Sequence, residues 1–129
     1  FVARANAYVA MKQYDRAIAD YSAAIKLDPD SAVAYRNRAI AYGARGETGP
    51  AIADYGEAIR IDPKDALAFY NRGNLHYRAK DYDRAIVDYS ETVRLDPDHA
   101  AAYNNRANLY LMKREADRAM PDLDAAIRL

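Results

Sequence analysis

The tetrapeptide "LDPD" at 27–30 is followed by "IDPK" at 61–64 and by "LDPD" at 95–98, each time after an interval of 34 residues. The residue before a proline is pushed out of the α-helical region, so each Asp-Pro pair predicts the end of a helix. Ser31 and Asp65 stand just beyond the first two pairs, where either side chain can cap a following helix. The interval therefore predicts an internal repeat with an ordered turn at each boundary.

The same interval divides the chain into four units, of which the first and the last are incomplete: 1–31, 32–65, 66–99 and 100–129. When each unit is numbered from 1 to 34, its aromatic and small residues recur at positions 4, 8 and 11 and again at positions 20, 24 and 27. Each set of positions lies on one face of a helix, where small residues let the backbones approach and aromatics, such as Tyr89 at position 24, fill the space between them. We therefore predict a helical hairpin in every unit, with helix A near 1–12, 32–44, 66–79 and 100–113, and helix B near 15–28, 50–62, 82–96 and 116–129.

This pattern resembles the tetratricopeptide repeat (TPR), which has an aromatic residue at position 4, a small residue at 8, Tyr at 11, Ala at 20, an aromatic at 24, Ala at 27 and Pro at 32. The resemblance covers all 129 residues. It implies an all-α fold of the alpha-alpha superhelix class, a right-handed TPR solenoid whose A helices line the concave side. We expect one domain over 1–129.

Two prolines depart from the repeat. Gly49-Pro50 interrupts repeat 2 between its helices and predicts a break with Pro50 in the first turn of helix B. Pro121 lies about one turn into the last helix, where a kink or fraying is expected.

Composition limits the kinds of partner. The chain has 19 basic and 19 acidic residues and a pI of about 6.9, which argues against the broad basic surface of a nucleic-acid binder. No apolar run approaches the roughly 20 residues of a membrane span. We therefore expect a protein or peptide partner, no nucleic acid and no membrane insertion. Without cysteine the compartment is left open, and we favour the cytoplasm over the periplasm.

Catalytic chemistry has little support in the sequence. Ser22 and Ser90 share one repeat position on helix B, and no periodic histidine accompanies them as a base. His76 stands at position 11, where the other repeats have tyrosine, so we interpret it as a packed aromatic. We expect no enzyme activity, no cofactor and no metal site.

Arginine recurs at position 7 and aspartate at position 23. These positions are equally far from the turn of the hairpin, so they lie at the same level of two antiparallel helices. A partly buried guanidinium needs a partner, and we expect structural ion pairs between helices A and B. The pairs are Arg4–Asp20, Arg38–Asp54, Arg72–Asp88 and Arg106–Asp122.

Asparagine recurs at positions 6 and 9, away from the packed aromatic face of helix A. A carboxamide can bond a peptide C=O and a peptide N–H together, whatever side chains the peptide carries. In the TPR family this side is the concave groove, where such asparagines contact an extended peptide. We expect a peptide-binding site in which the asparagines do not pack, formed by Asn6, Asn37, Asn71, Asn74, Asn105 and Asn108 with Arg36, Tyr70, Tyr77, Arg78, Asn104 and Met112.

The resemblance leaves several functions open. In the family's carboxylate clamp for acidic chaperone tails, three further positions are cationic, but here they hold Val2, Leu67 and Asn71. The asparagine pattern is more similar to the ladder in the superhelical domain of O-linked N-acetylglucosamine transferase. The alternative to a peptide scaffold is a structural or homotypic assembly module that self-associates through exposed repeat ends. An RNA-binding helical repeat ranks third because the pI is neutral.

Overall fold

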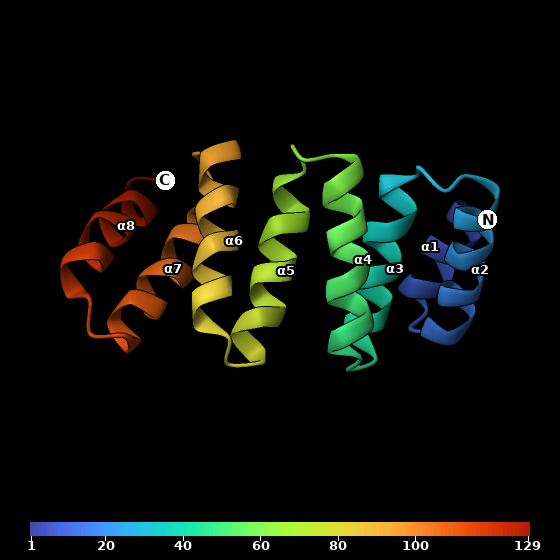
Figure 1. Cartoon of the computed structure of the whole chain (residues 1–129), viewed down its shortest axis with the longest axis horizontal. Coiled ribbons are helices and arrows are strands. Elements are labelled where there is room, and N and C mark those ends of the chain that lie inside the picture. The colour runs from blue at the N-terminus through green and yellow to red at the C-terminus, as the bar shows by residue number, and fades with distance from the viewer. The chain divides into compact units, whose positions relative to one another are not determined.

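The computed structural model describes residues 1–129 as eight α-helices without a strand (Figure 1). Every helix begins and ends within two residues of the sequence prediction. None of them combines the length and the apolarity needed to cross a membrane. The helices are α1 (Val2–Ala10), α2 (Tyr14–Leu27), α3 (Ala32–Ala44), α4 (Thr48–Ile61), α5 (Ala66–Arg78), α6 (Tyr82–Leu95), α7 (Ala100–Met112) and α8 (Ala116–Arg128).

The chain divides into two compact units, each made of two consecutive hairpins. Unit 1 comprises Phe1–Lys64 with helices α1 to α4, and unit 2 comprises Asp65–Leu129 with helices α5 to α8. In both units the A and B helices of a hairpin pack against each other, and the second helix of one hairpin packs against the first helix of the next. That all four hairpins form one domain stays a prediction.

Alanine and tyrosine build the core of both units. Alanine lets the helix backbones approach closely, and the tyrosine ring fills the space that remains. Tyr21 in unit 1 and Tyr89 in unit 2 occupy the same repeat position, and both are almost completely buried. The clusters around them are Ala5, Ala17, Tyr21 and Ala41 in unit 1, and Ala85, Tyr89, Ala102 and Leu109 in unit 2.

The helix starts confirm the two predicted caps and add two more, of which one is Asp81 Oδ1, accepting from the N–H of Arg84 at 3.4 Å. Ser31 Oγ accepts a hydrogen bond from the backbone N–H of Ala34 at 3.2 Å, and Asp65 Oδ1 accepts one from Ala68 at the same distance. His99 Nδ1 accepts from the N–H of Ala102 at 3.2 Å, so this histidine is a helix cap and not merely a turn residue. The caps satisfy backbone donors that have no partner inside the helix.

The two unusual prolines lie inside helices. Pro50 is in the first turn of α4, as predicted, because a proline there removes no intrahelical hydrogen bond, but the helix already begins at Thr48 and the break expected at Gly49-Pro50 lies before it. The fraying expected at Pro121 is absent, since α8 runs continuously from Ala116 to Arg128. The neighbouring Asp122 is buried and paired with Arg106, which holds this part of α8 against α7.

Each hairpin carries the predicted ion pair between its two helices. In all four pairs the arginine donates through Nε and Nη2 to the two carboxylate oxygens, over distances of 2.6 to 2.9 Å. The aspartates are only 2 to 7% exposed. A two-point contact of this kind fixes both the distance and the rotation of helix B relative to helix A. The paired residues are Arg4–Asp20, Arg38–Asp54, Arg72–Asp88 and Arg106–Asp122.

Candidate functional site

In unit 1, two of the predicted asparagines meet at the contact between consecutive repeats. Asn6 of α1 accepts a very short hydrogen bond at Oδ1 from the hydroxyl of Tyr21. The same oxygen accepts from Asn37 Nδ2 of α3 at 3.2 Å. One amide oxygen therefore joins helix B of repeat 1 and helix A of repeat 2.

Unit 2 repeats this arrangement at the equivalent residues. Asn74 Oδ1 accepts from the Tyr89 hydroxyl at 2.5 Å and from Asn105 Nδ2 at 3.4 Å. Asn105 Nδ2 also donates to the hydroxyl of Tyr70 at 3.3 Å. The Tyr70 ring is held between His99 and Tyr89, at centroid distances of 4.5 and 5.8 Å. One hydrogen-bonded network thus connects four side chains, which are those of Tyr89, Asn74, Asn105 and Tyr70.

A cavity of about 350 Å³ opens onto the network of unit 2. Four of its five lining residues are predicted site residues: Asn74, Tyr77, Arg78 and Asn105. The fifth is Tyr89, which sequence reasoning assigned to the core alone. Its ring is in the core, as predicted, but its hydroxyl reaches the cavity wall. The hydroxyl of a buried tyrosine usually makes a hydrogen bond. The recurring tyrosine at this repeat position was therefore the sequence feature from which such a contact could have been predicted.

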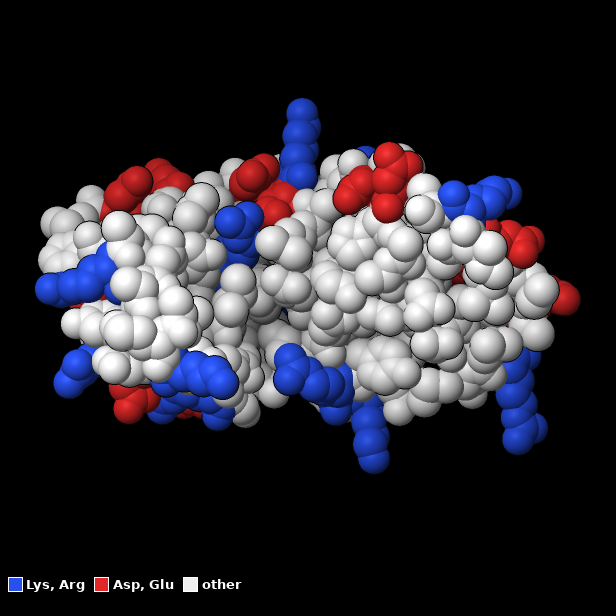
Figure 2. Space-filling view, turned by 180° about the vertical axis from the view of Figure 1, so that it is seen from behind, with Lys and Arg blue, Asp and Glu red and all other residues white.

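The cavity combines donors and a cation that the protein leaves unused. Arg78 is exposed and makes no hydrogen bond or ion pair, and Asn74 Nδ2 has no partner in the protein. Burial raises the pKa of the Tyr89 phenol, although the nearby Asn105 amide acts in the opposite direction, so the hydroxyl keeps its proton and donates. Figure 2 views the molecule from behind, and the surface of unit 2, on the right, is mostly uncharged with charged side chains along its margins.

The other predicted residues are distributed around this network. Asn71 lies one turn before Asn74 on α5 and is half-buried, whereas Asn108 is exposed on α7. Met112 Sδ accepts a weak hydrogen bond from the Tyr77 hydroxyl at 3.6 Å. Asn104 does not line the same cavity. It borders a different one, of about 370 Å³, with Ala100, Ala101, Leu123, Ala126 and Ile127. Arg36 lies half-buried in unit 1.

The expectation that the asparagines do not pack is wrong for four of the six. Asn37, Asn74 and Asn105 are half-buried, and these three and Asn6 are hydrogen-bonded within the protein. The helical periodicity correctly predicted that these side chains point away from the aromatic face of helix A. It could not show that the tyrosine of helix B reaches around to that side.

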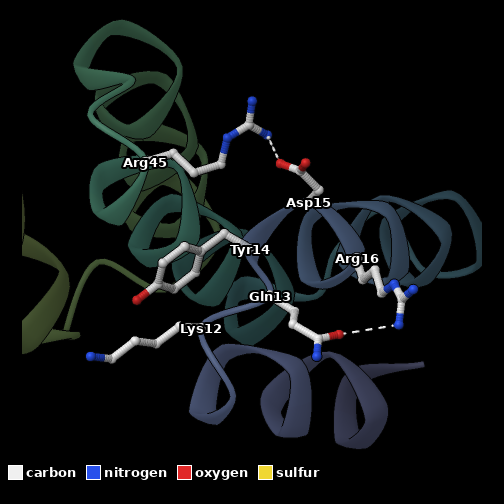
Figure 3. A pocket seen from close by; sticks show the side chains of 6 residues that line it. All are labelled: Lys12, Gln13, Tyr14, Asp15, Arg16 and Arg45. Carbon is white, nitrogen blue, oxygen red and sulfur yellow. Dashed lines mark hydrogen bonds and ion pairs between the residues drawn. The ribbon is translucent and has the colours of Figure 1, made fainter.

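A second cavity lies in unit 1, at the turn between α1 and α2, and measures about 390 Å³ (Figure 3). Most of its polar groups are already paired. Arg45 Nη1 donates to Asp15 Oδ1 at 2.9 Å, and Arg16 Nη1 donates to Gln13 Oε1 at 3.2 Å. The Asp15–Arg45 pair has its counterpart in unit 2, where Lys113 Nζ donates to Asp83 at 2.6 Å. These exposed pairs link consecutive repeats. The cavity is lined by Lys12, Gln13, Tyr14, Asp15, Arg16 and Arg45.

His76 is buried in the core, as the interpretation of a packed aromatic requires. Its Nε2 lies 3.7 Å from Asp88 Oδ2, beside the Arg72–Asp88 pair. Burial lowers the pKa of His76, although the Asp88 carboxylate acts in the opposite direction. His76 is therefore mainly neutral near pH 7 and is almost completely enclosed by the core.

Eight helices in four matching hairpins, with polar side chains exposed on the A helices, define a helical-repeat protein. The profile described as "TPR repeat" matches residues 5–46 and 44–80, and two profiles described as "Tetratricopeptide repeat" match residues 66–99 and 89–120. The chain belongs to the tetratricopeptide repeat family. TPR repeats are protein–protein interaction scaffolds, and the chain is one of them. No curated protein sequence matches it significantly.

Solved structures agree with this assignment. A crystal structure of MamA is similar over 98% of this chain and 74% of its own, with 25% sequence identity and a TM-score of 0.95. A second MamA structure gives 98% and 69% coverage, 25% identity and a TM-score of 0.92. The first TPR of Spaghetti (RPAP3), solved bound to the HSP90 peptide SRMEEVD, is similar over 88% of this chain and 90% of its own, with 25% identity and a TM-score of 0.84. The predicted all-α, alpha-alpha superhelix fold class is confirmed.

Proposed function

We propose that the chain is a non-catalytic scaffold that binds an extended segment of a partner protein along its A helices, through asparagine side chains. The observation that carries this proposal is the cavity of unit 2, where Asn74 and Asn105 stand side by side. An extended backbone exposes alternating C=O and N–H groups that an amide side chain can bond. The RPAP3 structure supports the proposal, because that TPR binds a peptide.

The selectivity of the site comes from the residues around the asparagines. Tyr77, Arg78 and Met112 surround the pair in unit 2, and Arg36 is the predicted selectivity residue of unit 1. Backbone hydrogen bonds contribute about 0.5–1.5 kcal/mol each, and ordering the peptide opposes them, so moderate affinity is expected. The unpaired Arg78 favours a segment of neutral or mildly acidic character.

A screen of a random-peptide display library tests the proposal. The wild-type protein should select extended peptides, and the variant in which Asn71, Asn74 and Asn105 are replaced by alanine should not retain them. SRMEEVD is the informative comparison, because the cationic positions of a carboxylate clamp are Val2, Leu67 and Asn71 here. We expect no preference for that peptide. Retention of the selected peptides by the alanine variant would contradict the proposal.

Homotypic assembly is the second candidate function, and the apolar cavity beside Ile127 favours it. Ile127 is 83% exposed, and its neighbours Leu123 and Ala126 are apolar. Exposed apolar surface of this kind promotes association. Light scattering over a concentration series separates the candidates: a mass that rises with concentration supports assembly, and a constant mass leaves the peptide scaffold alone.

A further inference from the structure

We infer that Tyr89 and Tyr21 are positioning residues that set the direction of the neighbouring asparagine amides, so that each unit presents donors and an acceptor to a partner backbone in a fixed order. The inference rests on the proposed function and deepens it. It assigns a role to two core tyrosines that the repeat pattern treats as filling alone.

The Tyr89 hydroxyl determines which end of the Asn74 amide faces inward. The Tyr89 residue is completely buried, so its hydroxyl is held in place and donates to Asn74 Oδ1 at 2.5 Å. With the oxygen turned inward, the two N–H groups of Asn74 Nδ2 point away from Tyr89. They have no partner in the protein and can donate to a partner's C=O.

Asn105 makes the opposite orientation of Asn74 unfavourable. Its Nδ2 donates toward Asn74 Oδ1 at 3.4 Å. If the Asn74 amide were reversed, two N–H groups would face each other and the Asn105 donor would lose its acceptor. Tyr89 and Asn105 therefore select the same orientation of the amide from two directions.

The same network leaves Asn105 as the acceptor of the pair. One of its N–H groups points to Asn74 and the other to the Tyr70 hydroxyl at 3.3 Å. Both donors are engaged, so its Oδ1 remains to accept a peptide N–H. Unit 2 therefore offers donors on α5 and an acceptor on α7.

Unit 1 contains the same hydrogen bonds between tyrosine and asparagines, but without an equivalent of the Tyr70 hydroxyl. Tyr21 donates to Asn6 Oδ1, and Asn37 donates to the same oxygen. The position of Tyr70 is occupied by Val2, which has no hydroxyl. Asn37 therefore keeps one free N–H, and its orientation is less strongly fixed than that of Asn105.

A fixed order of donors and acceptor restricts the partner chemically. The segment must present a C=O to Asn74 and an N–H to Asn105. Proline lacks the N–H, and an ester in place of that peptide bond lacks it as well. At the residue facing Asn105, either change should weaken binding by about two- to tenfold, the range expected for one neutral hydrogen bond.

Hydrogen exchange of the asparagine side-chain N–H groups tests the inference by NMR without any peptide. In the wild type, the Asn105 side-chain N–H groups should exchange about two- to tenfold more slowly than those of Asn74. Tyr89→Phe, which keeps the buried ring, should reduce that difference, because Asn105 alone then holds the Asn74 amide in its orientation. Tyr82→Phe is the matched control, because it deletes a hydroxyl from the same helix that makes no hydrogen bond, and the difference should persist.

Two results would overturn the inference: slower exchange at Asn74 than at Asn105 in the wild type, or an unchanged difference in Tyr89→Phe. The wild-type comparison holds even if Tyr89→Phe does not fold. Because no peptide is used, the inference can fail while selected peptides still bind to the protein. It can also hold if no peptide is found, in which case the proposed function alone has failed.

Discussion

Removing the carboxylate of Asp88 should destabilise the protein far more than removing the equivalent carboxylate of Asp20. Asp88 is 2% exposed and accepts from Arg72 at 2.9 and 2.8 Å. The Arg72 side chain is only 23% exposed, so Asp88→Ala leaves a guanidinium that water cannot fully solvate. Breaking a buried pair from one side costs about 3–5 kcal/mol, and we expect the lower end because Arg72 retains some contact with solvent.

Asp20→Ala is the matched control within the same chain. Its partner Arg4 has a side chain that is 61% exposed, so water replaces the lost carboxylate and the free energy of unfolding should change little. Urea unfolding followed by circular dichroism measures both variants. The double variant Arg72→Leu with Asp88→Ala should recover most of the loss, because no buried charge then remains. Equal losses for Asp88→Ala and Asp20→Ala would refute the reasoning.

Two further predictions concern the pH dependence of stability and the turns. Burial lowers the pKa of His76 below its ordinary 6.5, so the unfolded chain takes up a proton more readily and stability is lost as the pH falls through that value. His76→Tyr, which restores the residue of the other repeats, should lose less thermal stability between about pH 7.5 and about pH 5; an identical loss in both proteins would contradict this. Lys80 has a left-handed φ of 63°, and the residue at the same position of repeat 2 is Gly46, with a φ of 81°. Lys80→Gly should stabilise the protein by about 0.5–1 kcal/mol in urea unfolding, and Gly46→Ala should do the reverse; a destabilised Lys80→Gly variant would show that the turn does not strain the lysine.

The helices and the ion pairs could be predicted because they depend on distances along the chain. The Asp-Pro pairs mark the ends of helix B, and the 34-residue interval places every helix within two residues. Residues equally far from a hairpin turn lie side by side in two antiparallel helices, and on this basis each arginine could be matched with its aspartate. For example, Arg72 and Asp88 lie on opposite sides of one turn and meet as predicted.

The hydrogen bonds of the candidate site could not be predicted in the same way. Tyr89 was interpreted as a space-filling ring, because an aromatic at its position explains the packing without its hydroxyl. Its contact with Asn74 depends on how deeply α6 lies against α5, which a periodic pattern does not contain. Asn105 adds a contact from the next repeat, and His99 caps α7 with a ring nitrogen in place of the usual side-chain oxygen. Sequence reasoning therefore placed the asparagines on the correct side of helix A but underestimated how firmly they are held.

The most direct test of the account measures how uniformly peptide binding depends on the asparagine pair of unit 2. Several selected peptides of unrelated sequence are titrated against the wild type and against Asn74→Ala with Asn105→Ala. Because the asparagines are proposed to contact the backbone, every peptide should lose affinity by a similar factor, about tenfold or more for at least two lost hydrogen bonds. The control variant Glu91→Ala with Arg94→Ala, which removes an exposed ion pair from α6, should bind all of them normally. Undiminished binding by the asparagine variant, or a loss confined to one peptide sequence, would contradict the account.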